Sequence, residues 1–255
     1  MIDIITIRGT GEPLGGSGNM LRNVVDHLDR SRYRYVGDCP YPATVGPAGA
    51  GLDVDGPSET TSRAYGVAAL AAMIRNAPNP VGIITYSLGA LVLDDFRAIQ
   101  ARGAYLDCEV AFSAAVANPA RRAGESIDDT SYGYGINGPR DDFAPGPPHF
   151  EAANPEDVIT SCPLGSPLRA LADGMSAFSF AELGGWSQDM AERLRQCRFQ
   201  PVTLGWWQRP VETWRLYEET YWDIIGYLNG REHIAAYIDD GYCSRLADRI
   251  NALDL

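Results

Sequence analysis

Clusters of metal-binding residues are missing from this sequence. Its 255 residues include only three histidines, and its five cysteines are scattered singly, with no C-x-x-C pair. A structural zinc ion needs several such ligands at close spacing, so we expect no metal site and no metal-dependent reaction. An odd number of cysteines leaves at least one free thiol in a monomer. We expect buried, reduced thiols, with a disulfide between Cys162 and Cys197 as the open alternative.

Long apolar runs and a leader-like start are missing as well. No stretch of 18 apolar residues occurs, so no membrane-spanning helix is predicted. The first residues already show the pattern of a buried strand, without a basic segment followed by an apolar one. We therefore expect no signal peptide.

Positive charge is scarce. The chain has 21 Lys and Arg against 33 Asp and Glu, which gives a formal net charge of −12. Such a surface repels the phosphate backbone of nucleic acids and anionic membranes, so we expect neither as a partner. A hydrophobic content of 45% is ordinary for a globular protein, and the length fits one large domain or a domain with an insertion. We expect a monomer.

One short stretch organises the rest of the chain. An apolar run at 81–84 predicts a buried strand, residues 90–100 predict a helix, and Thr85-Tyr86-Ser87-Leu88-Gly89 forms the turn between them. Strand, sharp turn with a central Ser, and helix is typical of the nucleophile elbow of α/β-hydrolases. An ordinary strand–helix turn is the alternative. Thr85 departs from the usual Gly at a position where strand and helix are expected to pass closely.

Strand and helix patterns alternate along the chain and predict an α/β fold with a central, mostly parallel sheet flanked by helices. The strands are expected at 2–7, 33–38, 106–115 and 149–153, in addition to the one before Ser87. The helices are expected at 17–29, 59–76 and 240–253. A polar loop, 118–148, follows the strand at 106–115, at the edge where open α/β sheets bind ligands.

Residues 161–228 carry no strand pattern and hold all five tryptophans. We interpret them as a helical insertion into a hydrolase core made of 1–160 and 229–255. Trp206 and Trp207 in this segment, and Tyr86 beside the elbow serine, are candidates for contacting an apolar substrate. The alternative is that the aromatic residues form the small core of the insertion itself.

Chain order selects the partners of Ser87. In α/β-hydrolases the acid and then the histidine follow the serine. His27 precedes Ser87 and His149 begins a strand, which leaves His233, in a predicted loop after the insertion. Asp157 directly follows the strand at 149–153 and is the acid that a core strand positions best. We therefore predict general-base catalysis by His233, held by Asp157, with Ser87 as nucleophile.

An oxyanion hole is expected from backbone N–H groups. Leu88, the first residue after the serine, supplies one of them. A Gly-rich loop at 8–16 follows the first core strand, and its Thr10 is expected to supply the second. The glycine spacing in this loop does not match G-x-G-x-x-G, so we expect no dinucleotide and no other cofactor.

Five motifs together resemble the lysin B esterases of phages that infect mycolate-containing bacteria. They are RGTGEP at 8–13, TYSLGA at 85–90, ANPARRAG at 117–124, ANPEDVI at 153–159 and REHIAAY at 231–237. The first two are also similar to motifs of cutinases, which share the fold but lack the insertion. The family has Gln where this chain has Leu88.

The resemblance implies an activity and a place of action. The function of the family is hydrolysis of the ester that joins mycolic acids to arabinogalactan. The resemblance assigns the triad to Ser87, Asp157 and His233 and the oxyanion hole to Thr10 and Leu88. It also implies synthesis in the host cytoplasm and action at the cell envelope after membrane disruption. Two alternatives remain: a cutinase-like lipid or carboxyl esterase with another substrate, and a hydrolase-fold binding module without catalysis.

Overall fold

The computed structural model describes most of the predicted core. The described residues are 1–16, 18–44, 57–128, 133–143, 146–164, 166, 169 and 230–255. Most of the expected insertion lies outside them, together with Trp206, Trp207 and Cys197. The described residues before and after the expected insertion share one hydrophobic core.

A parallel sheet forms the centre of the protein. Its five strands are β1 (Ile2–Ile7), β2 (Tyr33–Asp38), β3 (Val81–Tyr86), β4 (Val110–Val116) and β5 (His149–Ala152), in the order β2-β1-β3-β4-β5. β1 and β3 are buried along their whole length, which agrees with their continuous apolar sequences. β4 begins later than expected, since residues 106–107 form a turn in which the N–H of Cys108 donates to the carbonyl of Tyr105 at 3.0 Å.

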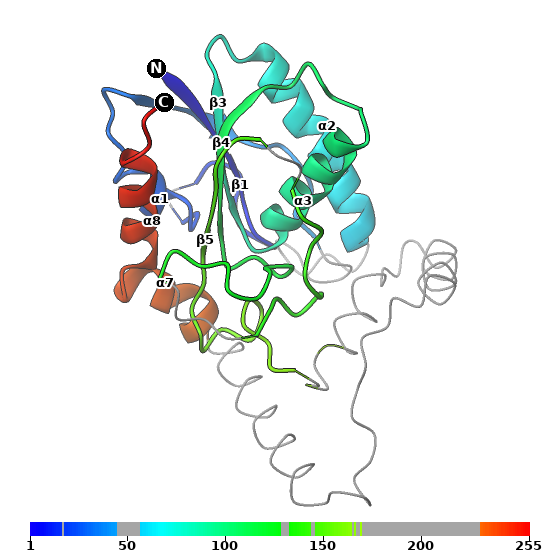
Figure 1. Cartoon of the computed structure of the whole chain (residues 1–255), viewed down its shortest axis with the longest axis vertical. Coiled ribbons are helices and arrows are strands. Elements are labelled where there is room, and N and C mark those ends of the chain that lie inside the picture. Colours follow the sequence, from blue (N-terminus) through cyan, green and yellow to red (C-terminus); the bar gives the residue numbers. More distant parts are fainter. Residues whose placement is uncertain are drawn as a thin grey trace, which may run out of the picture.

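Helices cover both faces of the sheet (Figure 1). On one face lie α2 (Glu59–Asn76) and α3 (Leu88–Ala101), and on the other lie α1 (Arg22–Val25), α7 (Ala236–Asp239) and α8 (Tyr242–Asn251). Ser58 caps α2 by accepting a hydrogen bond from the N–H of Thr61. None of the described helices has the length and hydropathy that crossing a membrane requires.

One predicted helix is shorter than expected, and another is preceded by an unpredicted helix. The segment 17–29 contains only the short α1 between turns, although its apolar face is buried as expected. The C-terminal segment is divided by Gly241, whose φ of 78° ends α7 and starts α8. The parallel order and the sharp turn from β3 into α3 confirm the predicted α/β-hydrolase fold.

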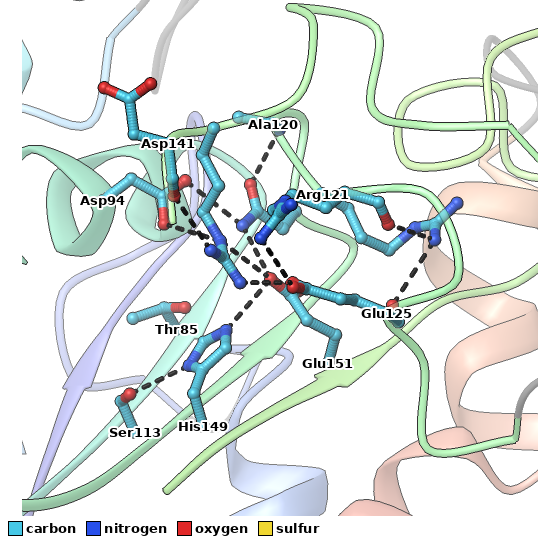
Figure 2. A network of polar contacts seen from close by, with 12 residues as sticks. Thr85, Asp94, Ser113, Ala120, Arg121, Glu125, Asp141, His149 and Glu151 are labelled. Carbon is cyan, nitrogen blue, oxygen red and sulfur yellow. Dashed lines mark hydrogen bonds and ion pairs between the residues drawn. The ribbon is translucent and has the colours of Figure 1, made fainter. Parts of the chain in front are cut away.

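The polar loop at 118–148 takes the place of a helix over the edge strand β5. The side chains of His149 and Glu151 point toward α3 and are covered by this loop, whose Arg140 lies 3.6 Å from both Glu151 and Asp94. Figure 2 shows Asp94, Glu151, His149 and Ser113 turned toward one another, with Thr85 beside them. The loop is therefore tied to the core by buried polar contacts.

Candidate active site

The elbow has the strained geometry that its sequence predicts. Ser87 has φ 51° and ψ −118°, a conformation that non-glycine residues rarely adopt. Its N–H donates to the carbonyl of Val116 at the end of β4, at 3.0 Å, which fixes the turn to the sheet. Ser87 is thereby held between β3 and the first turn of α3.

The close approach of strand and helix occurs at Gly89. A Cβ atom on Gly89 would lie 2.0 Å from the carbonyl oxygen of Ile7, so only glycine fits there. Thr85 is fully buried, and its hydroxyl donates to the carbonyl of Ala114 at 3.2 Å. The close approach seen at the second glycine of the motif leaves no room for a side chain, whereas the side chain of Thr85 is accommodated in the core.

Ser87, His233 and Asp157 meet in one hydrogen-bonded row. His233 Nε2 lies 3.1 Å from Ser87 Oγ, and His233 Nδ1 lies 2.9 Å from Asp157 Oδ2. Because a carboxylate only accepts, the proton of the neutral ring belongs on Nδ1, and Nε2 is left to accept from the serine. His233 and Asp157 are buried, while Ser87 is partly exposed. The row has the form that proton transfer from serine to histidine requires.

His233 lies on a helical turn and not in the loop that we expected. The turn, η1 (Arg231–Ala235), is a π-helix that begins after Gly230, and the N–H of Ala235 reaches the carbonyl of Gly230 at 3.0 Å. Tyr86 braces this turn, because its hydroxyl donates to the carbonyl of His233 at 2.8 Å. The two rings are stacked with their centres 5.3 Å apart. Single π-turns are frequent at functional sites.

Asp157 is fixed by the turn that follows β5. Its N–H donates to the carbonyl of Asn154, and its Oδ1 accepts from the N–H of Ile159 at 3.0 Å. Oδ2 faces His233 and also accepts from the hydroxyl of Tyr237 at 2.9 Å. Sequence reasoning located Asp157 but missed Tyr237, whose only signal was its position four residues after His233.

The predicted oxyanion donors lie on either side of the elbow. The backbone of Gly9 passes against Ser87, since a Cβ on Gly9 would lie 3.3 Å from the Cβ of Ser87. Thr10 follows Gly9, and Leu88 is the first residue of α3. Among the backbone hydrogen bonds that the described residues make outside helices and strands, none uses the N–H of Thr10 or Leu88.

Glu12 shapes the loop that carries Thr10, a role that sequence reasoning did not foresee. Its carboxylate accepts from the N–H of Gly9 and from the N–H of Met20, both at 2.7 Å. Partial burial raises the pKa of this carboxyl, against the effect of the two amide donors. Arg8 adds donations to the carbonyls of Cys39 and Glu12. The loop is therefore preorganised.

The remaining site predictions concern contact with substrate. Tyr86 is buried, with its hydroxyl directed to the backbone of His233, and its contact with substrate stays a prediction. Trp206 and Trp207 lie outside the described residues. Within the described parts of the chain, no group of three or more His, Cys, Asp or Glu is arranged to hold a metal ion.

A second Ser–His–acid row exists in the buried network of Figure 2. Ser113 Oγ lies 2.9 Å from His149 Nδ1, and His149 Nε2 lies 3.0 Å from Glu151 Oε1. Ser113 is only 1% exposed, so no ester can reach it. Burial and then the neighbouring Glu151 carboxylate raise the pKa of Asp94 well above its usual range. This network supports the loop and is not a second reaction centre.

No protein-family model matches the sequence, and no curated protein matches it at a significant level. Among solved structures, the catalytic core domain of an acetyl xylan esterase from Trichoderma reesei is similar at 18% identity and a TM-score of 0.46. The match covers 76% of this chain and 94% of that one. A cutinase-like protein from Cryptococcus sp. is similar at 15% identity and a TM-score of 0.42, over 79% of this chain and 96% of that one. Likenesses this distant do not decide an activity.

Proposed function

We propose that this protein is a serine ester hydrolase. The observation that carries the proposal is the row from Ser87 Oγ through His233 to Asp157, with spacings of 3.1 and 2.9 Å. The strained elbow and the N–H groups beside it add a nucleophile position and an oxyanion position to that row. An acyl-transfer reaction needs these three elements together.

The residues divide the reaction between them. Ser87 Oγ bonds to the acyl carbon while His233 Nε2 takes the hydroxyl proton, and the negative charge on the acyl oxygen faces the N–H groups of Thr10 and Leu88. His233 then gives the proton to the leaving alcohol as the C–O bond breaks. In the second half water attacks the acyl-enzyme while His233 again accepts a proton. His233 returns this proton to Ser87 Oγ as the bond between Oγ and the acyl carbon breaks and the acid product leaves.

Removing the serine hydroxyl tests the reaction class. Ser87→Ala is expected to lower kcat on p-nitrophenyl butyrate by about 10⁴-fold or more, because no other group can replace the nucleophile. Ser31→Ala is the matched control, since Ser31 lies on the exposed turn before β2 and its hydroxyl donates to Asp29. Equal turnover by wild type and Ser87→Ala would favour a non-catalytic binding module.

The finer proposal is that the acyl group is a long lipid. The five motifs shared with lysin B esterases support a mycolic acid ester of arabinogalactan as substrate. The segment rich in tryptophan between Asp157 and His233, which cutinases lack, supports the same choice. The corresponding place of action is the cell envelope of a mycolate-containing host, late in phage-mediated lysis.

A substrate comparison separates this proposal from its alternative. Purified mycolyl-arabinogalactan is incubated with wild type and with Ser87→Ala, and the free mycolic acids are quantified by mass spectrometry. Release that depends on Ser87 is expected. Hydrolysis of short esters without any release of mycolic acid would favour a cutinase-like esterase with another substrate.

A further inference from the structure

A buried tyrosine joins the two segments that carry the acid and the histidine. Asp157 and His233 are 76 positions apart in the chain, and Tyr237 stands one helical turn after His233, on α7. Its side chain is fully buried. The hydroxyl donates to Asp157 Oδ2 at 2.9 Å and accepts from the N–H of Asn154 at 3.1 Å. The helix that presents the histidine therefore also holds the acid.

The position of this hydroxyl has a chemical consequence. Asp157 Oδ2 accepts from His233 Nδ1 and from Tyr237 at the same distance, 2.9 Å, so the two donors share one oxygen. A second donor draws negative charge from that oxygen and weakens its hold on a protonated imidazole. Burial raises the pKa of Tyr237 well above its usual range, so the phenol keeps its proton and remains a donor at every pH at which the protein is folded.

We propose that Tyr237 is a positioning residue that fixes Asp157 against His233 and sets the pH at which His233 takes up a proton. Its consequence for turnover rests on the proposed ester hydrolysis, whereas its effect on the protonation of His233 does not.

Apart from the N–H of Asn154, the groups that hold the pair make hydrogen bonds that do not involve this hydroxyl. Ile159 keeps its N–H on Asp157 Oδ1, and the hydroxyl of Tyr86 keeps the carbonyl of His233. Glu232 accepts from the Nδ2 of Asn154 at 2.9 Å. The guanidinium of Arg121 holds the same turn through the carbonyl of Thr160 and the hydroxyl of Ser161. Tyr237→Phe therefore removes one donor to Asp157 and one acceptor for the N–H of Asn154, and it leaves the remaining charges.

The test is the pH dependence of kcat/KM for Tyr237→Phe on p-nitrophenyl butyrate. Asp157 then holds the imidazolium more strongly, so the acid limb is expected to move to higher pH by about half a unit to one unit. At the plateau kcat is expected to fall by about threefold to tenfold, because the carboxylate is less well fixed, with KM unchanged.

Tyr33→Phe is the matched control. Tyr33 is also buried, and its hydroxyl donates to the carbonyl of Ile250 at 2.7 Å, at the opposite edge of the sheet. Loss of this hydrogen bond is expected to lower the melting temperature to a similar degree and to leave the pH profile unchanged. A pH profile of Tyr237→Phe that coincides with those of Tyr33→Phe and wild type overturns the proposal.

Two further measurements keep the test independent of folding and of turnover. Tyr237→3-fluorotyrosine retains the side chain but donates more strongly, so its acid limb is expected to move to lower pH. NMR titration of the His233 ring in the Ser87→Ala background follows protonation without any substrate, and Tyr237→Phe is expected to raise its midpoint. An unchanged midpoint refutes the role of Tyr237, whereas absent Ser87-dependent turnover refutes only the proposed function.

Discussion

A single methyl group added at Gly89 should disable the site without removing any of the proposed catalytic groups. A Cβ there would lie 2.0 Å from the carbonyl oxygen of Ile7 and 2.7 Å from that of Arg8. Such contacts must open by about 1 Å, and the atoms in the way are backbone at the end of β1. The backbone of a packed sheet has no alternative conformation that relieves such contacts, so α3 and the loop that begins at Arg8 have to separate.

Gly89→Ala is therefore expected to reduce both stability and activity. Overpacking against backbone costs about 3 kcal/mol, which lowers the melting temperature by roughly 6–12 °C for a chain of this size. The displaced loop carries Thr10, and the displaced helix carries Leu88. A misplacement of about 1 Å in a site of this kind costs up to about 100-fold in rate, so kcat/KM should fall by about that factor.

Gly66→Ala is the matched control for this change. Gly66 lies on α2, and its added Cβ would meet the two methyl groups of the buried Val92 at 2.8 Å. These are side-chain atoms outside the site, so a loss of stability without a comparable loss of activity is expected. The higher helix propensity of alanine offsets part of that cost, by about 1 kcal/mol. Thermal melts and p-nitrophenyl butyrate kinetics compare the two variants. Wild-type stability and activity in Gly89→Ala would refute the role given to this contact.

Two more predictions concern buried titratable groups. The raised pKa of Asp94 means that the folded protein keeps a proton which the unfolded chain releases, so stability falls as the pH rises above about 4 toward the folded pKa. Asp94→Asn should therefore be more stable at neutral pH by about 1 kcal/mol, and its stability should depend less on pH. Urea melts between about pH 5 and pH 8 measure this. The prediction fails if the unfolding free energy of the variant changes with pH as steeply as that of the wild type. Burial raises the pKa of the Cys39 and Cys243 thiols to about 12, so iodoacetamide should label them only in urea. Mass spectrometry reads the labelling, and rapid modification of the native protein would show that the thiols are accessible.

Most of the sheet could be predicted because its strands carry their own signal. β1, β2, β3 and β5 begin at the expected residues. For β1 and β3 the reason is that a parallel strand buried along its whole length needs an apolar run. The thiols of Cys39, Cys108 and Cys243 are buried and free, as expected, while the partner considered for Cys162 lies outside the described residues. Substrate, oligomeric state and the role of each site residue stay predictions.

The sequence did not indicate which distant segments hold the polar loop at 118–148. Its expected role in ligand binding stays a prediction. In the structure its Arg121 donates to the carbonyl of Thr160, and Arg169 donates to the carbonyl of Gly135 at 2.7 Å. These buried guanidinium groups satisfy loop carbonyls that have no partner in a helix or strand. No local pattern in the sequence indicates which carbonyls they reach.

By itself the sequence determined the order Ser87, Asp157, His233 and the strand–turn–helix around the serine, because chain order and local periodicity are one-dimensional properties. Tertiary structure alone decided that Gly89 is the contact point of strand and helix and that His233 lies on a π-turn. It also decided that Tyr237 and His233 bind the same oxygen of Asp157. Those features depend on the distances between segments that are far apart in the chain. Distances of this kind follow from packing, which a single sequence does not display.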